Sequence, residues 1–238
     1  MATTAFAPGN LLISRSVYTG TAATVPFPGI LPNGAASLAN GTYPNVFLNE
    51  AADASFGVTA PIFLDQVTTS GTVLSSQNVT DLVSSQLKKN ISTSFPSKSE
   101  LALNPTPDGT GVTFVSYLAA PNLLDISNSN TPGYLDNTNP ASSVGTYQRS
   151  ITRIDSNGNV VDLTPINAYS GNNGRAALLG TNGLYYTVGN AGNGGNIGIA
   201  GAATTAGSAT VGTTSHRLHS PRRTESRYPV QARTGNFC

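Results

Sequence analysis

The sequence predicts an all-β protein built from antiparallel sheets, and three observations lead to this prediction. Short segments that alternate apolar and polar residues recur along the chain, each bounded by turn residues. Gly (25 residues) and Pro (15 residues) are abundant, as many turns require. Helical periodicity is confined to VTDLVSSQLKKN (79–90), which could form either a short helix or an extra strand.

The expected strands come mostly in pairs. A first strand is expected over NLLISRSVY (10–18). The pairs that follow are 61–76 around Ser70-Gly71, 99–119 around PTPDGTG, 149–166 around Asn157-Gly158, and 175–190 around Asn182-Gly183. Asn-Gly between alternating segments predicts a type I′ hairpin turn, in which both central residues have positive φ.

Taken in order, these strands predict four-stranded blades of an incomplete β-propeller, with a β-sandwich as the alternative. The first blade would use 10–18 and 61–79, the third only 175–180 and 183–190. The second would be complete, with 99–104, 112–119, 149–155 and 159–165. A closed propeller needs about four blades or more. We therefore expect an open sheet edge and an uncovered face, through which the chain would self-associate.

Four segments carry a resemblance to a known group of proteins. They are APGNLLISR, PIFLDQVTTSGTVLSS, SELALNPTPDGTGVTFVSY and YSGNNGRAALLGTNGLYYTVGN, between residues 7 and about 195. In order and type they resemble large secreted bacterial proteins of uncharacterised function that are predicted to be β-propellers. The resemblance implies that this chain corresponds to the N-terminal part of such a protein. None of the four segments is a catalytic signature.

Composition divides the chain into three regions. Residues 1–190 form the propeller-like part, 191–213 a Gly/Ala/Thr-rich linker, and 214–238 an Arg-rich tail expected to be disordered. The tail has five Arg and no Lys, both histidines and the only cysteine, as expected of translation in a shifted reading frame. A basic tail that binds nucleic acid or acidic surfaces is the alternative.

Charge and cysteine content indicate the environment. Charged residues make up only 10% of the chain, against about 25% in ordinary soluble proteins. Residues 1–213 carry seven basic and ten acidic side chains, so no nucleic-acid interface is expected there. No apolar run is long enough for a transmembrane helix. We expect a secreted or cell-surface protein, although MATTAFAPGNLLISRS lacks the features of a signal peptide.

Catalytic chemistry finds little support. A Ser-His-Asp or Cys-His site needs a fixed histidine, yet His216, His219 and Cys238 all lie in the tail. We therefore assign no catalytic residue and no zinc site. Paired carboxylates could hydrolyse glycans if two acids met across a cleft. The acids available for this are Glu50, Asp53, Asp65, Asp125 and Asp136.

Calcium is the one cofactor that the residues leave open. Asp155, Asn157 and Asn159 have the spacing of a calcium loop, but its sixth and twelfth positions hold Val160 and Ile166. A hairpin turn explains these residues equally well and is favoured. The polar segment 125–130 is a second, shorter fragment of the same kind.

The stretch GNNGR (171–175) provides the candidate ligand-binding residues Asn172, Asn173 and Arg175. In the functional interpretation Arg175 lines an axial channel. In the alternative, which is favoured, the stretch is a turn between blades.

Two functions remain. The first is a non-catalytic extracellular scaffold whose partner the sequence does not specify. The second is a propeller enzyme that acts on glycans or other polymers through carboxylates. The absence of histidine from residues 1–213 favours the first.

Overall fold

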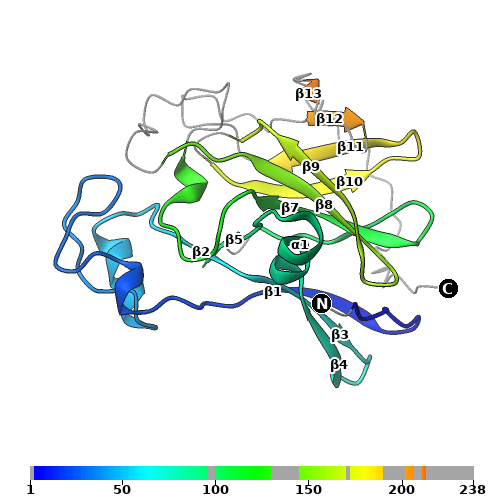
Figure 1. Ribbon diagram of the computed structural model, residues 1–238, viewed down its shortest axis with the longest axis horizontal. Helices are drawn as coiled ribbons and strands as arrows, with labels where there is room; N and C mark the ends of the chain where they lie inside the picture. Colours follow the sequence, from blue (N-terminus) through cyan, green and yellow to red (C-terminus); the bar gives the residue numbers. More distant parts are fainter. Residues whose placement is uncertain are drawn as a thin grey trace, which may run out of the picture.

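The structure is a computed structural model that describes residues 3–95, 100–129, 145–169 and 172–189, and the backbone of 202–205 and 211–212. Antiparallel strands dominate, which confirms the all-β prediction. Most strands belong to three sheets of three or four strands, and in Figure 1 the β3–β4 hairpin lies at the bottom and β11 to β13 lie at the top. Three short 3₁₀ helices lie in the loops: η1 (Ala22–Thr24), η2 (Asn45–Ala51) and η3 (Ile126–Asn128).

The first sheet has the order β1-β3-β4. It contains β1 (Leu11–Ser16), β3 (Ile62–Val67) and β4 (Val73–Asn78), as the segments 10–18 and 61–76 predicted. A separate two-stranded sheet of β2 (Val58–Ala60) and β5 (Thr93–Phe95) was not predicted, since three-residue strands show no periodicity.

The ambiguous segment 79–90 begins as a helix, α1 (Val79–Leu87). Asn78 caps it, because its side-chain oxygen accepts a hydrogen bond of 3.1 Å from Asp81 N. The helix ends at Lys88, whose φ of 54° is left-handed. Val79, Leu82 and Val83 are buried, and Val79 and Val83 join the core between the first and second sheets, so the helix packs on the inner side of the first sheet.

The second sheet is a meander with the order β6-β7-β8-β9. It contains β6 (Asn104–Pro105), β7 (Gly111–Tyr117), β8 (Arg149–Asp155) and β9 (Val160–Ile166). The prediction that 99–119 and 149–166 form one antiparallel sheet is thus confirmed. The strand expected at 99–104 is reduced to β6, since Leu101 has a φ of 63° that interrupts the extended backbone.

The third sheet is longer than predicted. β10 (Gly174–Leu179) and β11 (Leu184–Gly189) are the expected hairpin. β12 (Ala202–Thr205) and β13 (Val211–Gly212) extend it, within the range expected to be an unpaired linker. The reason is that ladder hydrogen bonds come from the backbone, so a Gly/Ala/Thr-rich run can pair with an open edge.

The hairpin turns are correctly placed, but the type I′ geometry predicted for the two Asn-Gly turns is wrong. At Gly71, Gly158 and Gly183 the glycine N–H donates to the carbonyl three residues earlier, over 2.9, 2.9 and 3.0 Å. Only the glycine has positive φ in each turn. These are therefore three-residue loops, a type I turn followed by a left-handed glycine, rather than type I′ turns.

The second sheet is covered on both faces, and all seven residues of β7 are buried. Val112 and Phe114 pack with Ile62 and Leu64 of the first sheet. On the other face, Val115 belongs to a cluster with residues of β8 to β11. The sheets therefore stack face to face, with β6 to β9 as the middle layer.

Candidate functional site

The predicted residues Asn172 and Asn173 lie beside a polar cluster formed by Glu100, Tyr117 and Arg149. Tyr117 ends β7 and Arg149 begins β8, and the two are directly paired across the sheet. The Arg149 guanidinium lies over the Tyr117 ring, 5.1 Å from its centroid. The antiparallel register therefore places a cation and a phenol together at one end of the middle sheet.

Arg149 connects three loops to this sheet. Its side chain is fully buried. Nη2 donates to the carbonyl oxygens of Ser127 (2.8 Å) and Asn172 (2.6 Å), and Nη1 donates to that of Tyr147 (3.3 Å). Burial lowers the pKa of Arg149, while the nearby Tyr117 and Glu100 oppose that change. The guanidinium thus acts as a donor that fixes backbone carbonyls in place.

Glu100 and Tyr117 form the acidic side of the cluster. The Tyr117 hydroxyl donates to Glu100 Oε1 and lies 3.3 Å from Asn173 Oδ1. Glu100 Oε2 accepts from Thr93 Oγ1 and Ser94 N, both at 3.0 Å. Burial raises the pKa of Glu100. It also raises the pKa of Tyr117 well above its usual value, and the charge of Glu100 adds to this, so the phenol stays protonated as a donor.

The third predicted residue, Arg175, is partly exposed on β10 and its positive charge acts to lower the pKa of Tyr117. The predicted residues therefore come together at one cluster, with Asn172 contributing a backbone carbonyl. Sequence reasoning missed Glu100, Tyr117 and Arg149. One signal was available in the sequence. Arg149 is the first residue of a strand whose residues are mostly buried, and a buried arginine needs several hydrogen-bond acceptors.

Two of the acids considered for carboxylate chemistry do meet. Asp53 follows η2 and Asp125 precedes η3, and they are 5% and 3% exposed. Asp125 Oδ1 accepts from Gly57 N at 3.1 Å, and Asp53 Oδ1 accepts from Ser55 N and Ser55 Oγ. Asp53 Oδ2 is buried, and no donor in the described part of the chain bonds to it. Burial raises the pKa of Asp125 to about 7, and the Asp53 carboxylate adds to the rise. Asp125 therefore holds its proton up to about neutral pH, in a buried space beside the Asp53 side chain.

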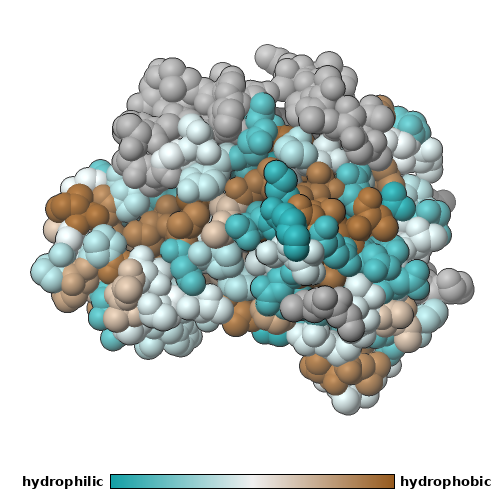
Figure 2. Space-filling view, in the orientation of Figure 1, coloured by the Kyte–Doolittle hydropathy of each residue, from teal (hydrophilic) through white to brown (hydrophobic). Residues whose placement is uncertain are grey.

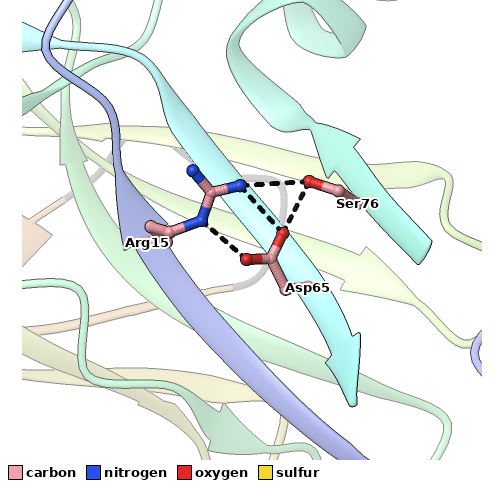
Figure 3. Close-up of polar contacts among 3 residues, drawn as sticks. All are labelled: Arg15, Asp65 and Ser76. Carbon is pink, nitrogen blue, oxygen red and sulfur yellow. Dashed lines mark hydrogen bonds and ion pairs between the residues drawn. The ribbon is translucent and has the colours of Figure 1, made fainter. Parts of the chain in front are cut away.

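The remaining acids lie apart. Asp65 forms a two-pronged ion pair with Arg15, at 2.6 and 3.2 Å, and accepts a hydrogen bond of 2.6 Å from Ser76 (Figure 3). Arg15 also lies over the Phe63 ring, 4.9 Å from its centroid. The charge and hydrogen bond of Arg15 lower the pKa of Asp65. Glu50 is exposed on η2, and Asp136 lies outside the described residues.

The candidate calcium loop forms a hairpin turn. Asp155 Oδ1 accepts from Asn159 N at 2.8 Å, and both carboxylate oxygens lie within reach of Asn159 Nδ2. In the ranges that the structure describes, no three acidic, histidine or cysteine side chains gather as a metal site would require. His216, His219 and Cys238 lie outside those ranges.

These clusters are suited to holding loops rather than to acting on a substrate. Tyr117, Arg149, Asp53 and Asp125 are all nearly closed to solvent, so a polymer cannot reach their polar atoms. The accessible features are apolar instead. Figure 2 shows hydrophobic areas over the loops between β1 and β2 and at the tip of the β3–β4 hairpin. The exposed side chains there include Ile30, Tyr43, Leu48, Val73 and Leu74.

No helix among the described residues is long and apolar enough to cross a membrane. Comparison of the chain with protein-family models, with curated proteins and with solved structures finds no match.

Proposed function

We propose that the chain is a non-catalytic scaffold of the β-propeller type that binds partners through the outer faces of its stacked sheets. One observation carries the proposal. The middle sheet is covered on both faces, whereas the third sheet leaves an apolar outer face open to solvent. Such faces are contact surfaces in soluble proteins.

The third sheet shows this most clearly. Along β11, buried Tyr185 and Thr187 alternate with Tyr186 and Val188, which are 44% and 37% exposed. Leu178 of β10 pairs with Tyr186 and is 47% exposed. On the first sheet, Leu11 and Ile13 of β1 are also exposed, on the face that carries the Arg15–Asp65 ion pair. Both ends of the stack therefore present exposed apolar side chains, and the third sheet presents them as an uninterrupted row.

Strand order supports the propeller form of the proposal. β6 to β9 and β10 to β13 are both four-stranded meanders in sequence order, as propeller blades are. Ala102, just before β6, forms a parallel bridge with Ala176 of β10, and Thr113 Oγ1 donates to Ala177 O at 2.7 Å. The first strand of the third sheet is thus joined to β7 and to the residue before β6 in the second sheet, and such close packing of neighbouring sheets is expected around a propeller axis.

The proposed setting is outside the cell or on its surface, in line with the resemblance to secreted bacterial proteins. The low charge content supports this setting, because uncharged polar side chains supply most of the solubility. Self-association through an open outer face or sheet edge is the first consequence of the proposal.

Analytical ultracentrifugation tests whether the chain self-associates through the outer face of the third sheet. We expect the purified chain to associate as its concentration rises, and the double variant Leu178→Ser with Tyr186→Ser to remain monomeric. Leu48→Ser is the matched control, because Leu48 is equally exposed but lies on η2, away from both outer faces. A chain that stays monomeric at every concentration, or a double variant that associates as the parent does, contradicts the proposal.

A carboxylate enzyme acting on glycans is the second candidate, and the convergence of Asp53 and Asp125 is what favours it. It ranks lower because both side chains are closed to solvent. Release of reducing sugar from soluble polysaccharides would support it, provided that Asp125→Asn abolishes the release.

A further inference from the structure

The N-terminal arm, residues 5–12, covers a cavity at one end of the second sheet. Phe6 N donates to Ser156 O, and Ser156 N donates to Thr110 O, both at 2.7 Å. These bonds join the arm to the β8–β9 turn and that turn to the β6–β7 turn. The cavity between them has a volume of about 350 Å³. That volume lies within the range of roughly 300–1,000 Å³ of small-molecule sites.

The lining combines an apolar base with convergent polar groups. Phe6 and Val112 contribute the apolar surface, while Gln66, Asp108, Ser156 and Asn157 contribute hydrogen-bonding groups. Gln66 is the most firmly placed of these. It is 4% exposed, and its Nε2 donates to Ala7 O at 3.0 Å. No donor among the described residues bonds to Gln66 Oε1, so this acceptor is fixed and available to a ligand.

The cavity carries a single charge. The Asp108 carboxylate accepts hydrogen bonds from Thr106 Oγ1 (2.6 Å) and Thr110 N (3.1 Å). These bonds lower the pKa of Asp108 to about 2, so the group is ionised at neutral pH. No Lys, Arg or His lines the cavity. The electrostatics therefore disfavour anionic ligands and favour ligands rich in hydroxyl donors.

We propose that this cavity binds one residue of a neutral sugar. Its hydroxyl groups donate to Asp108 and Gln66 and bond with Ser156 and Asn157, and the apolar C–H face of the ring packs on Phe6. A flat apolar surface next to hydrogen-bond acceptors and amides suits a sugar, because a sugar ring has an apolar C–H face and polar hydroxyl groups. The association test replaces Leu178 and Tyr186, neither of which lines this cavity, so the sugar proposal is tested independently of the scaffold function.

Isothermal titration of the full chain tests the proposal with D-glucose, D-galactose, N-acetyl-D-glucosamine and maltose. Inorganic phosphate and n-butylammonium are the anionic and cationic comparison ligands. We expect at least one neutral sugar to bind with a Kd of about 0.1–5 mM, as a small polar ligand would, and phosphate not to bind. The absence of binding by all four sugars overturns the proposal, as does tighter binding by butylammonium.

Variants then locate the binding. The side chains of Ser156 and Asn157 make no hydrogen bond to another described residue, so the double variant Ser156→Ala with Asn157→Ala keeps the fold intact. We expect it to weaken sugar binding about fivefold or more. Thr181→Ala is the matched control, since Thr181 has the same turn position as Ser156 in the β10–β11 hairpin, away from the cavity. Equal affinity of parent and double variant places the sugar elsewhere and overturns the proposal.

Discussion

At the scale of single residues, buried polar groups attach the long loops to the sheets. Asp53 and Asp125 join the loop after η2 to the loop before η3, through Gly57 N. Arg149 collects carbonyl oxygens from three further loop positions. In both places the hydrogen-bonding capacity of one buried side chain replaces regular secondary structure.

The Asp53–Asp125 pair predicts a pH-dependent stability. The pKa of Asp125 is about 7 in the folded protein, above its ordinary value of 3.8. As pH rises from about 4 to 7, the unfolded chain releases this proton while the folded chain retains it, so the folded state loses stability. We expect Asp125→Asn to stabilise the protein by about 2–4 kcal/mol above pH 7 and to have little effect near pH 4.

Urea unfolding between pH 4.5 and 8.5 measures this effect. Asparagine suits the position, because it tolerates the φ of 52° found there and its amide can donate to Asp53 Oδ2. Glu50→Gln, at an exposed acid, is the control and should leave the pH profile unchanged. A variant that is less stable than the parent at pH 8 would show that Asp125 does not hold its proton up to about neutral pH.

Arg149 and Arg175 give a matched test of structural against surface roles. Arg149→Met removes three carbonyl contacts and leaves the Glu100–Tyr117 pair without its buried cation. We expect a loss of about 3–5 kcal/mol, as for a broken buried ion pair. Arg175→Met, at a partly exposed residue, should cost about 1 kcal/mol or less. If thermal unfolding shows that the two variants lose equal stability, Arg149 does not fix the loop carbonyls in place.

At the scale of elements, the turns decide how the sheets are joined to each other. The three-residue hairpin loops at Gly71, Gly158 and Gly183 have the same geometry, yet their surroundings differ. At Gly158 an added Cβ would lie 2.4 Å from Thr4 O and 2.7 Å from Gln77 Oε1. At Gly71 nothing lies within 4 Å of that position. The β8–β9 turn is thus a docking point for the N-terminal arm, and the β3–β4 turn is open.

This difference predicts the outcome of two alanine substitutions. Gly71→Ala should cost only the left-handed backbone penalty, about 1–2 kcal/mol. Gly158→Ala should cost at least about 1 kcal/mol more, because the backbone of the arm must move away from the new methyl group. Chemical denaturation of both variants measures the two losses in the free energy of unfolding. If the two losses are equal, the arm does not pack on this turn.

At the scale of the whole molecule, three sheets are stacked. The middle sheet is covered on both faces, and the outer faces of the other two are open to solvent. The hydrophobic clusters on either side of β7 hold the stack together. The outer rows at Leu11 and Ile13, and at Leu178 and Tyr186, lack such a cover. Stability and association are therefore linked, since any partner that covers an end stabilises the folded state by mass action.

The Arg-rich tail, expected to be disordered, provides a prediction at this scale. Replacing His216, His219 and Cys238 together with serine should leave the melting temperature of the protein unchanged, since a segment without apolar periodicity contributes no core. Differential scanning calorimetry of the parent and the triple variant measures this. A fall of more than about 4 °C, which corresponds to roughly 1–2 kcal/mol for a domain of this size, would show that the tail packs on the body.

The sequence by itself determined the fold class and the positions of the main hairpins. Alternation of apolar and polar residues and the turn glycines are local signals, and they located β1, β3, β4 and β7 to β11. The same signals failed for β2, β5, β12 and β13, because short strands form through backbone pairing with a neighbour that already exists. Turn type was also not readable, since Asn-Gly suits both kinds of loop.

Only the tertiary structure decided which polar residues meet. Asn172 and Asn173 were predicted as part of the stretch GNNGR, but their partners Arg149 and Tyr117 come from two different strands, β8 and β7. Asp53 and Asp125 are 72 positions apart in the chain, and their sequence neighbours give no sign that they share a buried space. The cavity beneath the N-terminal arm likewise exists only because the arm crosses two turns. Such sites depend on distances between elements, which the sheet stacking sets and no local pattern encodes.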